Sequence, residues 1–310
     1  MEKSRALPWV AFGAVCIFWG TTAPAIRVAV RYFPPLVLSG VRFAIAGAAL
    51  LASLAAMGKG PRNWRVALRR SIPGGISLAL ANALTCWGLV SVQSGQGAVL
   101  LATTALWMTL IDSLWRGNPT GAPSKLVWLG TALGLGGVAL LVDAPSGLFG
   151  VSTGTCVLLV SSLGWAYGSV WQSRHPSHLP PVLESSLQML IAAIVLLPVA
   201  ALIGERWNPH ISSTGWLAFG FLILTGSLIG FVSFVYILRN LPPRIVGLYT
   251  YVNPVVATWA GWWWLDERAK PRFWLASGMI LGSVALVRLS VSRRRAVRRG
   301  YATDSTLPLS

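Results

Sequence analysis

The chain of 310 residues contains little charge, and acidic side chains are especially scarce. Only 11% of its residues are charged, and 8 Asp and Glu stand against 25 Lys and Arg. Because 55% of the residues are hydrophobic, too little polar surface remains for a water-soluble globule. A net charge of +17 would suggest a nucleic-acid partner in a soluble protein. Here the basic residues lie mostly between apolar runs, so no nucleic acid is expected.

Residues that serve catalysis or metal binding are equally rare. Cys16, Cys86 and Cys156 each fall within an apolar run and have no paired spacing, so we interpret them as packing residues. The three histidines lie between apolar runs, and the sequence has no HExxH, CxxC or GxxxxGK[ST] motif. We therefore expect no metal, no cofactor and no enzymatic activity. A lipid-modifying membrane enzyme remains the alternative.

The sequence is rich in long apolar runs. A helix needs about 20 such residues to cross a bilayer. Short connections leave no room for a soluble domain, so the chain is predicted to be an all-α integral membrane protein with ten transmembrane helices. These are expected at 8–28, 34–57, 71–91, 96–116, 124–143, 151–172, 181–203, 214–238, 245–265 and 271–290.

The basic residues predict the orientation of these helices. If the N-terminus is cytoplasmic, 18 Lys and Arg lie on that side and six on the other. Both termini are therefore predicted to be cytoplasmic. The polar tail 291–310 is expected to be disordered. Its run from Arg293 to Arg299 could bind anionic lipid, but a role as a topology anchor needs nothing more and is favoured.

The chain also repeats itself. Trp19-Gly20 recurs as Trp165-Ala166, and Pro34-Pro35-Leu36 recurs as Pro180-Pro181-Val182, both at an offset of 146. We expect two copies, 8–143 and 151–290, each with five helices. Because five is odd, the second copy should cross the membrane inverted relative to the first. Transporters built this way bind substrate near the midplane, between the copies.

Several motifs resemble those of one transporter family. The stretch Phe18 to Gly47, FWGTTAPAIRVAVRYFPPLVLSGVRFAIAG, and the later TYVNPVVA followed by Glu267 are similar to the EamA branch of the drug/metabolite transporter superfamily, and most of all to its YedA-like bacterial subgroup. The resemblance implies a secondary transporter of the bacterial inner membrane, monomeric or homodimeric. Such proteins export small metabolites, such as amino acids, or amphiphilic drugs by alternating access.

Departures from the family pattern remove carboxylates from the membrane interior. Asn118 stands where the second copy has Glu267, and Gln188 stands where the subgroup often has Glu. In a separate departure, Ala105 stands where the fourth helix of relatives usually has a central proline. A carboxylate proton relay is therefore not expected.

Arg42 is the strongest single candidate for substrate binding. It is the one strongly basic residue well inside a predicted span, where a cation costs at least ~2.5 kcal/mol unless it is compensated. It would either hold a substrate carboxylate, or bond to carbonyls of neighbouring helices, or extend toward the headgroups.

Aromatic and polar residues within the spans could line a cavity around it, as in most ligand pockets. Ordinary helix packing is the alternative for any one of them, and the repeat-matched pair Trp87 and Tyr236 is favoured as a set. The full candidate set comprises Trp19, Arg42, Asn82, Trp87, Thr103, Thr104, Trp107, Trp165, Tyr167, Gln188, Tyr236, Tyr249, Tyr251 and Asn253.

Three further expectations concern local structure. Pro254 is predicted to break its helix and to act as a hinge, because proline removes a helix hydrogen bond. Asp112 is expected to pair with Arg116 one helical turn on. Glu184 is expected in the first turn of its helix, where the helix dipole favours a carboxylate.

Overall fold

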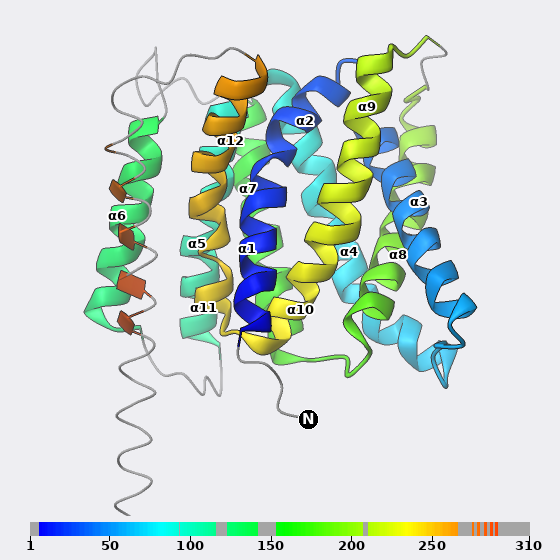
Figure 1. Cartoon of the computed structure of the whole chain (residues 1–310), viewed down its shortest axis with the longest axis horizontal. Coiled ribbons are helices and arrows are strands. Elements are labelled where there is room, and N and C mark those ends of the chain that lie inside the picture. The colour runs from blue at the N-terminus through cyan, green and yellow to red at the C-terminus, as the bar shows by residue number, and fades with distance from the viewer. Residues whose placement is uncertain are drawn as a thin grey trace, which may run out of the picture.

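The computed structural model describes residues 6–92, 94–115, 123–141, 153–206 and 210–265, together with 275, 278–279, 282–283, 286–287 and 289–290. Every regular element among them is helical. The helices stand side by side, so that their ends form two opposite faces of the bundle (Figure 1). We call the face at which α1 begins the N-terminal end, and the other face the opposite end.

In the first half of the chain, α1 (Leu7–Gly20) and α2 (Thr22–Ala29) form one interrupted span. The following helices are α3 (Pro35–Ala56), α4 (Trp64–Ser91), α5 (Ser94–Leu114) and α6 (Lys125–Leu141). The interruption lies at Thr21. There the hydroxyls of Thr21 and Thr22 donate to the carbonyls of Phe18 and Trp19. Such side-chain bonds compete with the helix ladder.

The second half begins with α7 (Thr153–Arg174) and α8 (Pro181–Leu202). A span of three consecutive segments follows: α9 (Ser213–Phe221), the π-helix η1 (Leu222–Phe231) and α10 (Val232–Asn240). The short α11 (Pro243–Val246) then leads into α12 (Tyr249–Leu265). Most of the predicted helix 271–290 lies outside the described residues, so the count of ten stays a prediction.

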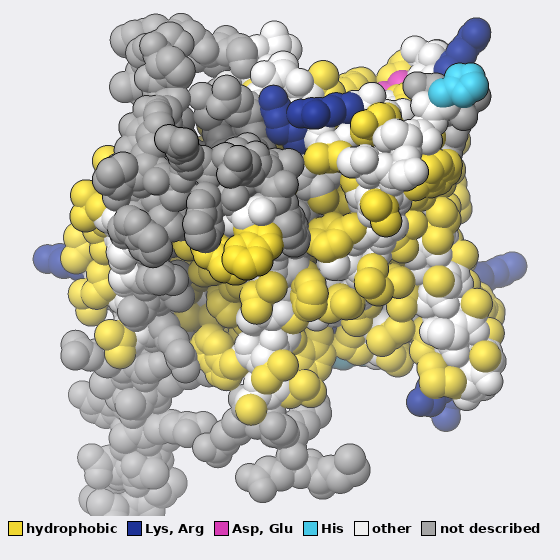
Figure 2. Space-filling view, turned by 45° about the horizontal axis from the view of Figure 1, so that its top comes forward, with side chains coloured by type: hydrophobic (Ala, Val, Ile, Leu, Met, Phe, Trp, Pro, Cys, Tyr) yellow, Lys and Arg dark blue, Asp and Glu magenta, His cyan; other side chains and the backbone are white. Residues whose placement is uncertain are grey.

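Five stretches of described helix are long and apolar enough to cross a membrane. They are Leu7–Ala29, Pro35–Ala56, Trp64–Ser91, Pro181–Leu202 and Ser213–Asn240. Hydrophobic side chains cover much of the flank of the bundle between its ends (Figure 2). This distribution is that of an integral membrane protein, since lipid offers polar side chains no hydrogen bonds.

Two expectations about the spans were wrong. Helix α4 begins at Trp64, seven residues earlier than predicted, because the side chain of Asn63 accepts a hydrogen bond from the backbone N–H of Val66 and caps the helix. The basic stretch before Ser71 is therefore helical. Helix α12 runs from Tyr249 to Leu265 without a break at Pro254. The discontinuity of this span lies before Tyr249, between α11 and α12.

Helices α3 and α8 follow the two Pro-Pro motifs, so they are equivalent in the repeat, and they pack closely. A Cβ atom at Gly40 would lie 2.7 Å from Leu197, and one at Gly47 would lie 2.9 Å from Leu190. Contacts therefore move forward along α3 as they move backward along α8. The two equivalent helices run antiparallel.

Both helices also end in the same turn. Gly58 after α3 has φ +66°, and Gly204 after α8 has φ +78°. In each turn the residue after the glycine donates its N–H five residues back, from Lys59 to Leu54 and from Glu205 to Ala200. This is the Schellman arrangement, in which the positive φ favours glycine. The repeat offset of 146 therefore extends to these two turns.

The carboxylate of Glu205 then reaches the start of α3. Its Oε2 accepts from the backbone N–H groups of Leu36 and Val37 at 2.9 and 3.0 Å. Helix α3 begins at Pro35, and the preceding Pro34 offers no side-chain cap. Glu205 therefore caps the helix that carries Arg42 from the other half of the chain.

Candidate substrate cavity

A cavity of about 160 Å³ lies among helices of both halves of the chain. Residues of α1 to α5 line it from the first half, and residues of α7, η1 and α12 line it from the second. Most of these residues lie in the middle of their helices or toward the opposite end. Helix α3, for example, starts at that end, and Arg42 follows Pro35 by seven residues, or about 10 Å of helical rise. None of the described residues lining the cavity is Asp or Glu.

Arg42 lies in the wall of this cavity and is only 3% exposed. Its Nη2 donates to Asn82 Oδ1 at 2.9 Å, and its guanidinium carbon lies 4.7 Å from the centre of the Phe43 ring. Among the described residues it forms no ion pair, and its buried Nε has no hydrogen-bond partner. Burying a guanidinium without a counter-ion costs free energy, and an anion bound in the cavity would reduce that cost.

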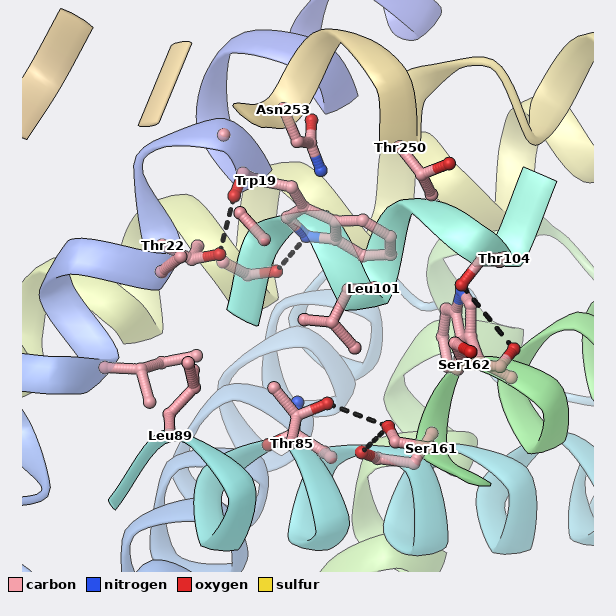
Figure 3. Close-up of a pocket in the computed structure, with 18 of the residues that line it drawn as sticks. Trp19, Thr22, Thr85, Leu89, Leu101, Thr104, Ser161, Ser162, Thr250 and Asn253 are labelled. Atoms are coloured by element: carbon pink, nitrogen blue, oxygen red, sulfur yellow. Dashed lines mark hydrogen bonds between the residues drawn. The ribbon is translucent and has the colours of Figure 1, made fainter. Parts of the chain in front are cut away.

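A row of hydroxyl groups connects α4, α5 and α7 beside the cavity (Figure 3). Thr85 and Ser161 share a hydrogen bond of 2.9 Å, and Thr103 and Ser162 share one of 2.8 Å. Ser161 also donates to the carbonyl of Ala81. These hydroxyls could donate to a polar ligand after a rotation about one bond.

An aromatic cluster bounds the cavity toward the N-terminal end. Trp19, Trp165 and Tyr249 line the cavity, and the ring of Phe234 lies 4.9 Å from each tryptophan and 5.8 Å from Tyr249. Trp165 Nε1 donates to the Tyr249 hydroxyl at 2.7 Å. The cluster offers an apolar surface next to the cation, a combination typical of ligand sites.

The π-helix η1 contributes a backbone acceptor to the same wall. Trp19 Nε1 donates to the carbonyl of Gly226 at 2.8 Å (Figure 3). A Cβ atom at Gly230 would lie 2.3 Å from that indole nitrogen. The irregular turn and the glycine together let the indole approach the backbone closely. Such π turns frequently mark functional sites.

The structure brings seven of the candidate residues to the cavity. These are Trp19, Arg42, Asn82, Thr104, Trp165, Tyr249 and Asn253. Thr103 lies next to them through its bond to Ser162. Pro254 follows Asn253 within continuous helix, and its role as a hinge stays a prediction.

The other candidates lie elsewhere. Trp87 and Tyr167 are 43% and 55% exposed on the surface of the bundle. Tyr236 lines a second pocket at the N-terminal end with Arg239, so the structure does not bring it together with Trp87. The remaining three lie inside the bundle, away from the cavity lining: Trp107 packs against the core, Tyr251 donates to the carbonyl of Thr131, and Gln188 lies nearer the N-terminal end.

Sequence reasoning missed the small hydroxyl side chains Thr22, Thr85, Ser161, Ser162 and Thr250, which also line the cavity. A signal for two of them was present. Ser161 and Ser162 precede Trp165 by four and three residues and therefore share its helix face.

At the N-terminal end the structure shows two partners of Asp112 that the sequence did not predict. This carboxylate, with a 1% exposed side chain, binds the guanidinium of Arg174 and lies 3.4 Å from Nη2 of Arg244. Arg116 lies outside the described residues. Helix packing thus brings two cations from distant parts of the chain to Asp112, and its expected pairing with Arg116 stays a prediction.

Glu184 lies in the first turn of α8, as expected, and forms an ion pair with Arg239. Arg239 also donates to the carbonyl of Leu179 and the hydroxyl of Ser177. The three described carboxylates, Asp112, Glu184 and Glu205, are therefore all engaged in structural contacts away from Arg42.

Comparison with known proteins identifies the family. The model of the EamA-like transporter family matches residues 8–143 and 152–289. The inner membrane transporter YedA of Escherichia coli is 38% identical over 93% of both chains. A probable terminal-alkyne amino-acid exporter of Streptantibioticus cattleyicolor is 25% identical, covering 95% of this chain and 97% of its own.

A solved crystal structure superposes with a TM-score of 0.75 at 21% identity, covering 94% of this chain and 99% of the other, and supports the fold alone. The named relatives are transporters, which argues against an enzyme. The residues matched, the apolar helices and the cavity between the two matched stretches agree: this chain is a membrane transporter and belongs to the EamA-like transporter family.

Proposed function

We propose that this protein is a gradient-driven exporter of small metabolites that combine a carboxylate with an apolar or aromatic body. One observation carries the proposal. A cavity lined by both halves of the chain contains the cation Arg42, which forms no ion pair among the described residues. The substrate itself would then supply the missing negative charge.

The chemistry of the cavity favours such a substrate. The Arg42 guanidinium can form paired hydrogen bonds with a carboxylate. The hydroxyls of Thr85 and Ser161 can bind further polar groups, and the rings of Trp19 and Trp165 can cover an apolar part. Amino acids fit this description, and one distant relative carries the name of a probable amino-acid exporter.

A second candidate substrate class is an amphiphilic drug. The aromatic cluster supports it, because aromatic faces attract organic cations. Arg42 would repel such a cation, which is why the carboxylate class ranks first. A lipid-modifying enzyme, the other class considered from the sequence, finds no support in the family match.

The proposed mechanism is alternating access between two inverted five-helix repeats. Its support is that the equivalent helices α3 and α8 run antiparallel and that the cavity lies between the matched stretches. We further propose that the N-terminal end faces the cytoplasm, with both termini there and the tail beside anionic lipid. The protein would act in the bacterial inner membrane as a monomer or homodimer.

Counterflow into proteoliposomes tests the proposal. A panel of monocarboxylates, neutral amino acids and one lipophilic cation should show exchange of carboxylate-bearing compounds. Arg42→Gln should reduce that exchange strongly, whereas Arg65→Gln, at an exposed cation of α4, should leave it unchanged. Equal carboxylate flux in Arg42→Gln and the native protein would contradict the anion-binding role. Exchange of the cation alone would favour the second candidate.

A further inference from the structure

Four buried polar atoms lie in the half of the bundle nearer the N-terminal end and have no hydrogen-bond partner among the described residues. They are Ser71 Oγ and Ser77 Oγ of α4, and Ser185 Oγ and Gln188 Oε1 of α8. Buried polar groups are normally paired, and each exception calls for an explanation. Four exceptions on two adjoining helices are hard to attribute to packing alone.

These side chains meet where α4, α7 and α8 adjoin. Gln188 Nε2 donates to Gln172 Oε1 at 2.7 Å and to Glu184 Oε1 at 3.2 Å. We call Ser71, Ser77, Gln172, Ser185 and Gln188 the polar cluster.

Glycines allow the helices to close over this cluster. A Cβ atom at Gly74 would lie 2.4 Å from Gln188 Nε2, and one at Gly168 would lie 1.9 Å from Ser77 Oγ. With no side chains at these two positions, α4 lies directly against Gln188 and α7. The polar cluster is therefore enclosed by close helix packing in this conformation, although its side chains are polar and would be expected in contact with water.

The repeat relates the polar cluster to the cavity. Arg42 follows Pro35 by seven residues, and Gln188 follows Pro181 by seven. At the same offset, Ser39, which donates to the Arg42 partner Asn82, corresponds to Ser185. Since α3 and α8 run antiparallel, equivalent residues lie at opposite depths in the bundle. Within the polar cluster, Ser185 and Gln188 thus hold the places in the second half that Ser39 and Arg42 hold in the first.

We infer that the polar cluster is the counterpart of the cavity, and that it lines the substrate passage when the protein opens toward its N-terminal end. Rigid-body movement of inverted repeats exchanges the two environments. Separation of α8 from α4 would then hydrate the serine hydroxyls and the Gln188 amide. The serine hydroxyls are uncharged donors that suit the carboxylate of the same substrate and hold it by hydrogen bonds, without the permanent cation of the cavity. The inference rests on the proposed function.

The ion pair between Glu184 and Arg239 stands beside this passage. Arg239 also holds the carbonyl of Leu179 and the hydroxyl of Ser177, so α10 is attached to the segment between α7 and α8. All of these contacts lie within the second half of the chain, so a rigid-body opening would leave them intact.

Cysteine accessibility tests the inference without knowledge of the substrate. In a variant lacking Cys16, Cys86 and Cys156, Ser185→Cys is compared with Met189→Cys, a fully buried apolar residue about 6 Å farther along α8. A membrane-impermeant maleimide is applied to vesicles of either orientation, with the N-terminus located by protease cleavage of a tag. Ser161→Cys reports on the cavity in the same assay.

Ser185→Cys should react on the order of tenfold faster than Met189→Cys, from the face that carries the N-terminus, because only hydrated thiols react readily. Ser161→Cys should react from the other face. Reaction of Ser185→Cys no faster than that of Met189→Cys, or from the wrong face, would overturn the inference. Ser71→Cys repeats the test should Ser185→Cys fail to fold. If the cysteines label as expected but the counterflow panel shows no exchange of carboxylates, the proposed substrate is contradicted and the inference about the passage is not.

Discussion

Replacing Asp112 with asparagine should destabilise the protein more than any other single change to its described ion pairs. The Asp112 carboxylate is 1% exposed and lies between Arg174 and Arg244, whose side chains are 13% and 3% exposed. The substitution keeps the shape of the side chain but removes the negative charge between two largely buried guanidinium groups. Breaking a buried pair in this way costs about 3–5 kcal/mol.

A loss of that size corresponds to a fall in melting temperature on the order of 10 °C. It can be measured by thermal unfolding of the purified protein in one detergent. Glu184→Gln is the matched comparison, because its partner Arg239 is 19% exposed and keeps its bonds to Leu179 and Ser177. Its loss should be only about 1 kcal/mol.

A second substitution separates the electrostatic cause from a general packing defect. In the Asp112→Asn background, Arg244→Met removes one uncompensated cation and should recover part of the lost stability. A melting temperature within about 1 °C of the native protein for Asp112→Asn, or a further fall in the double variant, would refute the reasoning.

The remaining predictions concern the ends of the bundle, the cavity and coupling. Glu205→Ala should cost about 1–2 kcal/mol of unfolding free energy because α3 loses its cap, whereas Lys59→Ala at the equivalent position should change the melting temperature little. Trp19→Phe should cost about 1 kcal/mol through the lost bond to the Gly226 carbonyl, and an unchanged melting temperature would argue against that bond. A cysteine in the Arg293 to Arg299 run should escape an impermeant reagent in intact cells, and ready labelling there would contradict the proposed orientation. An imposed pH gradient should alter flux little, since the cavity cation is a guanidinium that keeps its proton, and strong proton-driven uptake would contradict this.

The sequence predicted the class of protein and half of the candidate cavity residues, because those features follow from local composition. Apolar run length indicated the helices, and the Trp19 and Trp165 repeat identified two residues that the structure places together, with ring centroids 5.8 Å apart. Arg42 could be recognised from the sequence, because placing a cation within an apolar span costs free energy however the helix packs.

What the sequence could not predict depends on helix rotation and on contacts between distant segments. The exposed Trp87 and the partly buried Trp19 are both tryptophans within a span, and nothing local to Trp87 shows that it faces outward. Asp112 found its partners 62 and 132 residues away, beyond the reach of a rule for adjacent helical turns. The π-helix around Gly226 has no composition signal either, and the residue that bonds its carbonyl, Trp19, lies 207 residues away in the sequence.

The paired turns after α3 and α8 have a consequence for how the chain enters the membrane. In both turns a glycine with positive φ is followed by a charged residue. This residue is Lys59 at one end of the bundle and Glu205 at the other. During insertion, positively charged flanks are retained on the cytoplasmic side, whereas acidic residues influence orientation little. Lys59 would thus fix the orientation of the first copy, whereas the equivalent position in the second copy can carry an acidic residue. Under the proposed orientation, the same glycine turn places a basic residue on the cytoplasmic side and an acidic residue on the opposite side, where Glu205 caps α3.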